Sequence, residues 1–430
     1  MNQSIFLAFR EKSFLFLWIG EVLTQISINL FLFYLILSVF GLTKSNTAVA
    51  IVIITCNAPA IIFGVLAGVY VDHWSKKQVL IWTNIFRALF IFILAFIHTD
   101  LVIIYIISLI IAFISQFFIP AENPLIPLIV QKENLYSANA LFVLANYGSV
   151  LVAYMLSGTI ILFFGEQGTL FVLTFLLLVS SVSIFFVRYR IEEKYKENVR
   201  MTLKVNIRHE IKAALNVVRK TKEISSSLFL LALSPILILL IAAVAPGYAT
   251  QVLGMDVEKF PITFVTPAAI GMLLGAVILA NRFQNIAKEK MVIAGLFISG
   301  LSLLILPYGS IISSKEFVQD FNLFLPHILM ITSLHVLVVL AFFLGLANSL
   351  VFVPSNTILQ ENTTDENRGK IYGLLSSIVG LFSLVPLIAV GGLSDLIGVS
   401  HVITGMGICV LLIGIYQVYA HKIGYSQSIN

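Results

Sequence analysis

Long runs of apolar residues, separated by short polar breaks, fill most of the chain. A helix that crosses a bilayer needs about 20 mostly apolar residues, and twelve runs are of that kind. They cover residues 14–40, 46–71, 78–97, 101–120, 139–164, 168–188, 225–246, 262–280, 291–308, 325–352, 371–390 and 400–420. The pattern predicts an all-α membrane protein with twelve transmembrane helices. The even number places both chain ends on the same side.

The longest polar break, residues 189–224, separates six runs from six. We therefore expect an N-terminal six-helix bundle over 1–188 and a C-terminal six-helix bundle over 225–430. The break also holds apolar residues at helical spacing among cations: Ile207, Ile211, Leu215 and Val218. This predicts an amphipathic linker helix, either lying on the membrane face among anionic headgroups or solvated.

The cations are distributed unevenly between the two sides. Of the 26 Lys and Arg residues, 22 fall on the side of the amino terminus and the linker, and 3 fall on the other side. Lys and Arg collect on the cytoplasmic side of membrane proteins. We therefore expect a multi-pass protein of the cell (inner or plasma) membrane, with the linker and both termini in the cytoplasm.

Composition agrees with membrane insertion and excludes several functions. The chain is 59% hydrophobic and 11% charged, whereas soluble domains carry about 25% charged residues. The first apolar run is too long for the core of a cleaved signal peptide. Cys56 and Cys409 lie inside apolar runs and give neither a disulfide framework nor a metal site.

The chain also carries no catalytic signature. It has no phosphate-binding loop, no Gly-x-Ser-x-Gly elbow, and no second His to complete a zinc site with His209-Glu210. We therefore expect no enzyme, no cofactor, no bound metal and no nucleic-acid partner. Without ATP binding, an ion gradient or the gradient of the substrate must drive any transport. A membrane enzyme or scaffold is the alternative from another class, and it lacks a supporting motif.

The end of the second run and the start of the third carry a distinctive pattern. Gly64 and Gly68 lie on one helix face, where small residues let another helix approach closely. Asp72 follows after three more residues, and then Lys76 and Lys77. This spacing resembles the signature between the second and third helices of the major facilitator superfamily. That family usually has Arg, Gly and Arg at the positions of His73, Ser75 and Lys76.

Two further segments are similar to the macrolide-efflux-like branch of that superfamily. Residues 118–141 contain a Pro-Ala turn, Ile-Pro, and then Ala-Asn-Ala-Leu, and residues 354–373 contain Arg-Gly-Lys-Ile-Tyr-Gly. Phe118-Ile119-Pro120 and Phe352-Val353-Pro354 also correspond between the halves, as do Gly64 and Gly68 with Gly271 and Gly275. The resemblance covers most of the chain and implies two six-helix pseudo-repeats that rock about a central site. Two family features are missing, a Gly-Pro motif in the fifth span and an Arg in the fourth.

The resemblance implies a cytoplasmic gate built on Asp72. The positive end of the helix that begins near Thr363-Thr364-Asp365-Glu366 would hold the Asp72 carboxylate. Lys76 and Lys77 would reach Glu122 beside the fourth span. Arg87, inside the third span, would act as a further gate cation or extend toward the headgroups.

Ionisable side chains inside spans are costly and are therefore functional candidates. Glu21 is the first candidate for proton coupling, and Gln25 and Asn29 continue its stripe at four-residue steps. The stripe should face a central cavity, or alternatively bond to a neighbouring helix. His335 is the second coupling candidate, although a lone His in a helix bundle is commonly a packing residue. Further polar residues are candidates for the cavity lining: Gln116, Asn146, Thr332 and Asn348.

These patterns predict a monomeric secondary active transporter in contact with membrane lipid. It would export small lipophilic molecules by proton antiport, because the spans contain many Phe residues and few charges. An importer or a flippase for a lipid-like substrate or other metabolite is the alternative within transport.

Overall fold

The computed structural model describes residues 5–72, 74–131, 134–188, 222–282, 286–308, 333–363 and 365–427. The chain forms two compact units, which are described separately. The first comprises Met1–Thr43 and Ile51–Asn206, and the second comprises Lys44–Ala50 and Ile207–Asn430. The predicted domain boundaries at 188 and 225 stay a prediction, and most of the predicted amphipathic linker lies outside the described residues.

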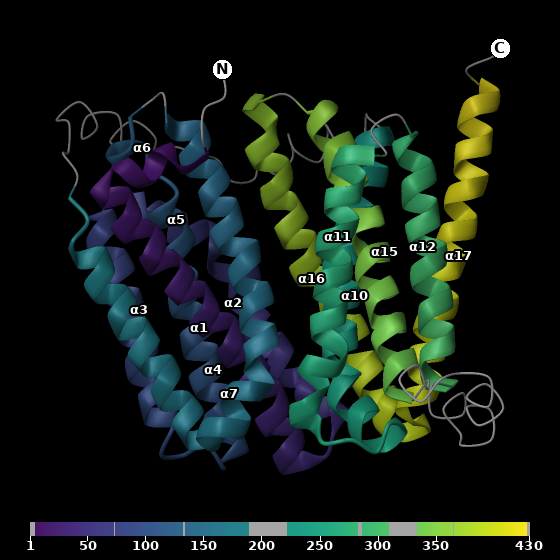
Figure 1. The fold of residues 1–430 in the computed structure, drawn as a ribbon, viewed down its shortest axis with the longest axis horizontal. Coiled ribbons are helices and arrows are strands. Elements are labelled where there is room, and N and C mark those ends of the chain that lie inside the picture. The colour runs from purple at the N-terminus through teal and green to yellow at the C-terminus, as the bar shows by residue number, and fades with distance from the viewer. Residues whose placement is uncertain are drawn as a thin grey trace, which may run out of the picture. The chain divides into compact units, whose positions relative to one another are not determined.

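The described residues of the first part of the chain are mostly helical, and the helices run side by side (Figure 1). They are α1 (Lys12–Thr43), α2 (Asn46–Asp72), α3 (Lys76–Leu94), α4 (Leu101–Ser115), α5 (Phe118–Glu122), α6 (Ile126–Ile129) and α7 (Leu135–Phe185). A short 3-10 turn, η1 (Ile5–Arg10), precedes α1. Asp100 begins α4, because its carboxylate accepts hydrogen bonds from the backbone N–H groups of Val102 (2.9 Å) and Ile103 (3.1 Å).

The second part of the chain is also built from helices. They are α10 (Lys222–Gly247), α11 (Thr266–Arg282), α12 (Lys288–Ile305), α15 (Ser333–Glu361), α16 (Asp365–Ile397) and α17 (Val399–Gln427). Single turns extend three of them: η4 (Tyr248–Val252) follows α10, η6 (Pro261–Val265) precedes α11, and η7 (Leu306–Tyr308) follows α12. A further turn, η5 (Val257–Lys259), lies between η4 and η6.

Each of the twelve predicted spans coincides wholly or largely with a helix. The predicted spans 139–164 and 168–188 are the two arms of α7, which is interrupted at Gly165. The backbone of Gly165 has φ 68° and ψ −178°, a conformation that is essentially restricted to glycine. The apolar pattern therefore located this break to within a few residues.

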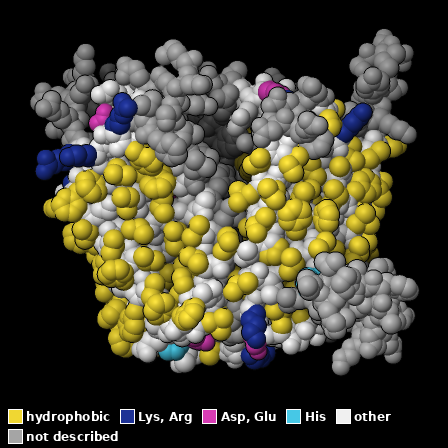
Figure 2. Space-filling model, in the orientation of Figure 1, with side chains coloured by type: hydrophobic (Ala, Val, Ile, Leu, Met, Phe, Trp, Pro, Cys, Tyr) yellow, Lys and Arg dark blue, Asp and Glu magenta, His cyan; other side chains and the backbone are white. Residues whose placement is uncertain are grey.

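The helices are suited to a bilayer in length and in surface chemistry. Among the described residues, ten helical segments are long and apolar enough to cross a membrane, and Asn46–Ala60 forms a shorter apolar helix. On the face shown in Figure 2, hydrophobic side chains cover the flanks of the helices, and the charged side chains in view gather near helix ends. The fold is that of an all-α multi-pass membrane protein.

The first unit is packed around α1, which makes its most extensive contacts with α7. A Cβ atom added at Gly20 would lie 2.6 Å from Cγ1 of Ile184, so the absent side chain sets the spacing of these two helices. Phe14, Leu17 and Phe118 are buried in the adjoining apolar core.

The second unit depends on a close crossing of α11 and α15. A Cβ atom at Gly271 would lie 2.0 Å from the carbonyl oxygen of Phe342, and one at Gly345 would lie 1.7 Å from that of Ala268. At Gly275 it would lie 2.0 Å from Oγ of Ser349. These glycines let the two backbones touch, as small residues do between membrane helices.

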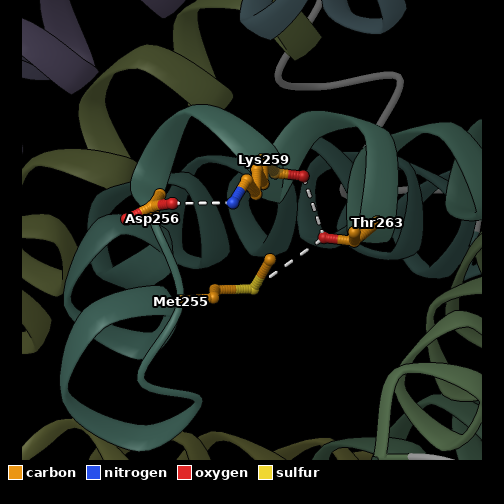
Figure 3. A network of polar contacts seen from close by, with 4 residues as sticks. All are labelled: Met255, Asp256, Lys259 and Thr263. Atoms are coloured by element: carbon orange, nitrogen blue, oxygen red, sulfur yellow. Dashed lines mark hydrogen bonds and ion pairs between the residues drawn. The ribbon is translucent and has the colours of Figure 1, made fainter.

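A short turn joins α10 to α11 through local bonds (Figure 3). Lys259 Nζ lies 2.8 Å from Oδ2 of Asp256, and Oγ1 of Thr263 donates to the carbonyl of Lys259 at 3.0 Å. Both charged side chains are exposed, so the ion pair contributes about 0–1 kcal/mol.

Candidate functional site

Polar side chains from five helices meet in the interior of the first unit. We call these eight residues the buried polar cluster: Glu21, Thr24, Gln25, Asn84, Arg87, Ser115, Glu122 and Ser180. They come from α1, α3, α5 and α7, with Ser115 at the end of α4. Glu21 is 0% exposed, and Arg87 and Glu122 are each 3% exposed. Charges buried this deeply persist only when they are paired or hydrogen-bonded.

Two carboxyl groups lie near each other in this cluster. Glu21 and Glu122 each influence the ionisation of the other, and the charge of Arg87 acts on both. Nε2 of Gln25 donates to Oε1 of Glu21 at 2.9 Å. Oε2 of Glu21 and Oε1 of Glu122 are buried, and neither accepts a hydrogen bond from an N–H or O–H group of the described residues.

Arg87 is held firmly beside the two carboxyl groups. Its Nε donates to Oγ of Ser115 at 3.1 Å, and its Nη1 donates to Oδ1 of Asn84 at 2.9 Å. The guanidinium carbon lies 4.8 Å from the centroid of the Phe118 ring, in a cation–π contact. The positive charge acts on both Glu21 and Glu122. Arg87 is therefore a fixed counter-charge within the cluster and does not extend to the headgroups.

Hydroxyl and amide groups connect the helices that carry these charges. Nδ2 of Asn84 donates to Oγ1 of Thr24 at 2.7 Å and to Oγ of Ser180 at 3.0 Å. Ser180 Oγ lies 2.7 Å from the carbonyl oxygen of Gly20 and 2.8 Å from Oγ1 of Thr24. This network joins α1, α3 and α7, so the position of Arg87 depends on all three.

The predicted lysine partners of Glu122 lie elsewhere. Lys76 is buried at the start of α3, and Nζ of Lys77 lies 5.1 Å from the centroid of the Phe185 ring. No ion pair between described residues joins either lysine to Glu122. The sequence singled out Glu21, Arg87 and Glu122 individually but assigned the last two to a gate, whereas the structure brings all three together.

Several other predicted site residues lie outside the described side chains. Gly64, Gly68 and Asp72 belong to α2, but the structure does not describe their side chains, and the same holds for the first residues of α16. Thr332 lies outside the described residues. The predicted cytoplasmic gate therefore stays a prediction.

The remaining candidates are dispersed. Asn29 and Gln116 donate to backbone carbonyls of their own helices, at 2.7 Å and 3.0 Å. Asn146 is exposed on α7, and His335 is exposed near the start of α15. Asn348 donates to Oγ of Ser234 at 2.8 Å. The predicted roles of these residues in a cavity or in coupling stay predictions.

Asn348 borders a small cavity in the second unit. Its volume is about 10 Å³, and Ser234, Ser299 and Leu296 also line it. A water molecule needs about 10–15 Å³ measured in this way, so the space suits one water molecule and not a substrate.

A larger groove lies on the surface of α3 and α4. It has a volume of about 720 Å³, and its lining includes Trp74, Trp82, Phe86 and Phe117. Trp74 and Trp82 are 51% and 54% exposed. On a membrane-spanning unit such aromatic surfaces meet lipid, so the groove alone does not indicate a substrate site.

The second unit contains one polar junction that the sequence analysis missed. The carboxylate of Asp395, near the end of α16, accepts hydrogen bonds from the backbone N–H groups of Asn46 (2.8 Å) and Thr47 (2.9 Å). Oγ of Ser45 and Oγ1 of Thr47 also donate to it, at 2.6 Å and 2.7 Å. Asp395 therefore caps the first turn of α2 from 348 residues away. In the sequence, this capped helix start was indicated by Ser-Asn-Thr at 45–47, which is typical of the first residues of a helix.

The described residues contain no group of three or more His, Cys, Asp or Glu side chains placed to hold a metal ion. What distinguishes the first unit is a set of ionisable groups buried among membrane-spanning helices. Together the fold and this cluster define a polytopic membrane transport protein.

Comparison with known proteins identifies the family. Residues 17–317 match the family model described as Major Facilitator Superfamily, and the chain belongs to that superfamily of secondary transporters, not to an enzyme family. The crystal structure of the nucleoside transporter NupG aligns with a TM-score of 0.71 at 12% identity, covering 94% of this chain and 99% of that chain. A bacterial homologue of the iron transporter ferroportin, in an inward-facing state, aligns with a TM-score of 0.62 at 17% identity, covering 96% and 99%. These likenesses show the fold alone.

Two curated relatives are similar along nearly their whole length. The uncharacterized MFS-type transporter YfmI of Bacillus subtilis is 23% identical over 434 residues, which cover 97% of both chains. Macrolide efflux protein A of Streptococcus pyogenes is 23% identical over 416 residues, covering 94% of this chain and 95% of that protein. The similarity to a macrolide efflux protein agrees with the resemblance that the sequence motifs indicated.

Proposed function

We propose that this transporter exports lipophilic small molecules across the cell membrane in exchange for protons, acting as a monomer by alternating access. The observation that carries the proposal is the carboxyl group of Glu21, fully buried in the membrane-spanning helix α1. Such a residue is a functional candidate by default. Its hydrogen bond from the half-buried Gln25 links it to a less buried position on the same helix.

The substrate class and the direction of transport have separate support. The distant similarity to macrolide efflux protein A favours export. The membrane-spanning helices carry few charged side chains, and a carrier of sugars or anions would need more polar or cationic groups to bind its substrate. An importer or a flippase remains the alternative, and the same vesicle assay distinguishes it by the direction of accumulation.

The experiment is transport into everted membrane vesicles, with a panel of lipophilic dyes and an imposed proton gradient. Glu21→Gln keeps the shape of the side chain and removes its ionisation. We expect it to abolish uphill accumulation and to leave downhill exchange intact, because the substrate-binding surface is unchanged. The matched control is Glu166→Gln, since the Glu166 carboxylate is exposed on α7 and accepts a hydrogen bond from Ser38 at 3.5 Å, away from the buried polar cluster. If Glu21→Gln still accumulates dye uphill with the unmodified pH dependence, coupling through Glu21 is excluded.

A further inference from the structure

The hydrogen bonding of Glu21 and Glu122 depends on whether one of their carboxyl groups is protonated. An ionised carboxylate only accepts hydrogen bonds, whereas a protonated carboxyl also donates one. Oε2 of Glu21 and Oε1 of Glu122 are both buried, and neither has a hydrogen-bond partner among the described residues. A proton on one of the two carboxyl groups would supply the donor that these oxygens lack.

The charge balance of the cluster also favours one proton on the two carboxyl groups. Arg87 is always protonated in proteins, so two ionised carboxylates beside it would leave a net charge of −1. One proton on the pair makes the cluster neutral, and two would leave a net charge of +1. Uncompensated charge is strongly disfavoured in a site that is 0–3% exposed.

No other described charge on the packed helices alters this balance. The helices α4 and α6 contain no Asp, Glu, Lys or Arg. The acid of α7, Glu166, contacts Ser38, which lies 17 residues and therefore about 26 Å along α1 from Glu21. On α3, Lys77 lies over the Phe185 ring, and Lys76 is eleven residues from Arg87, or about 16 Å along the helix. Lys12 is exposed at the start of α1.

We propose that Glu21 and Glu122 form a single proton-binding site, in which two carboxyl groups share one proton and Arg87 is the fixed counter-charge. Release breaks one carboxyl O–H bond and transfers the proton to water, leaving two carboxylates against one guanidinium. Gln25, which donates to Glu21, is half-buried and lies beside the pair on α1. Assigning this proton to transport rests on the proposed function, but its presence does not.

The test is infrared spectroscopy of the purified full-length protein in an ester-free detergent, without substrate. A protonated carboxyl group has a C=O stretching band that neither carboxylates nor amides share. We expect Glu21→Gln and Glu122→Gln each to remove the same single band, because the remaining carboxylate then balances Arg87. Arg87→Met should double the band, since both carboxyls must then be neutral. Glu166→Gln is the control and should leave the band unchanged.

Three results would overturn the proposal. A band that survives in Glu122→Gln at full strength assigns the proton to Glu21 alone. A band unaffected by either glutamine substitution means that the pair holds no proton. An unchanged band in a folded Arg87→Met protein removes the counter-charge role. If Arg87→Met does not fold, the two glutamine variants still decide the question.

This readout separates the proton site from the proposed function. The expected bands together with no proton-dependent dye transport would leave the site standing and reject proton antiport. Proton-driven export by an unmodified protein that lacks the band would support antiport and reject the shared site.

Discussion

At the residue scale, Asp395 resembles an ordinary helix cap, except that it lies far along the chain from the helix that it caps. Its carboxylate serves the first backbone N–H groups of α2, as Asp100 serves those of α4. Asp100 is two residues from the N–H group that it caps, and Asp395 is 349 residues from Asn46. The same chemistry therefore shapes a local turn in one case and attaches two distant parts of the chain in the other.

Removing the charge of Asp395 should loosen the start of α2. In Asp395→Asn one carboxylate oxygen becomes an amide, and we expect a loss of about 1 kcal/mol, which is typical for a helix cap. Hydrogen exchange at the amides of Asn46 and Thr47 should accelerate, while that at Val102 and Ile103 stays unchanged. Asp100→Ala is the control and should give the opposite pattern, because Oδ1 of Asp100 accepts both capping bonds and an asparagine would keep that oxygen. Unchanged exchange at Asn46 would show that Asp395 does not hold this turn.

The residues of the buried polar cluster differ in how far they were predictable. Glu21 and Arg87 stand out because an ionisable residue in an apolar run is costly and needs a reason. The association of Glu122 with them was not predictable, because it lies 101 residues from Glu21 in a segment that also contains nearby polar residues. Asp395 was overlooked since the apolar pattern ended its span at 390, whereas α16 continues to Ile397.

At the element scale, the crossing of α11 and α15 depends on three glycines. Gly271 and Gly275 correspond in the sequence to Gly64 and Gly68, and the structure shows close packing at both Gly271 and Gly275. Gly345, on the facing helix, has no such spacing partner in the sequence, and only the contact with Ala268 reveals its role. The corresponding pair in α2, Gly64 and Gly68, stays a prediction.

Gly345→Ala should destabilise the second unit. The added methyl group would meet the backbone oxygen of Ala268, which cannot move without shifting α11. We expect a loss of about 1–3 kcal/mol, the usual cost of overpacking, measured as thermal unfolding of the protein in detergent. Gly405→Ala on α17 is the control, because no atom lies within 4 Å of its added Cβ, and there alanine should be neutral or stabilising. Equal behaviour of the two variants would contradict the close crossing.

At the scale of the whole molecule, the length and spacing of the apolar runs were sufficient to predict the helices. Each span is a long apolar run with a polar break at either end, so the twelve spans could be read directly, including the break at Gly165 in α7. The assignment of segments to the two compact units was harder to predict from the sequence. The division of the sequence at residues 189–224 places 44–50 in the first half, but this segment belongs to the second compact unit, where Asp395 binds it.

The orientation of the molecule in the membrane follows from its cations. With 22 Lys and Arg residues predicted on one side and 3 on the other, both termini should be cytoplasmic. A reporter that is active only in the cytoplasm should therefore work when fused after Asn430, and a tag inserted near Lys315 should react with an impermeant reagent from outside. A carboxyl terminus reached only from outside would contradict the orientation.

The three charges of the buried polar cluster also bear on how the chain is made. Glu21 in α1 is synthesised first, Arg87 in α3 second and Glu122 in α5 last, so the charges enter the membrane with alternating sign. A charged residue at the centre of a helix costs about 2.5–3.5 kcal/mol during insertion by the translocon. A nascent chain released after α1 would hold an acid without a partner, whereas one that has reached α3 already contains a balanced pair. The order of the spans thus gives Glu21 an opposite charge as soon as α3 is inserted, before the second acid, Glu122, enters the membrane.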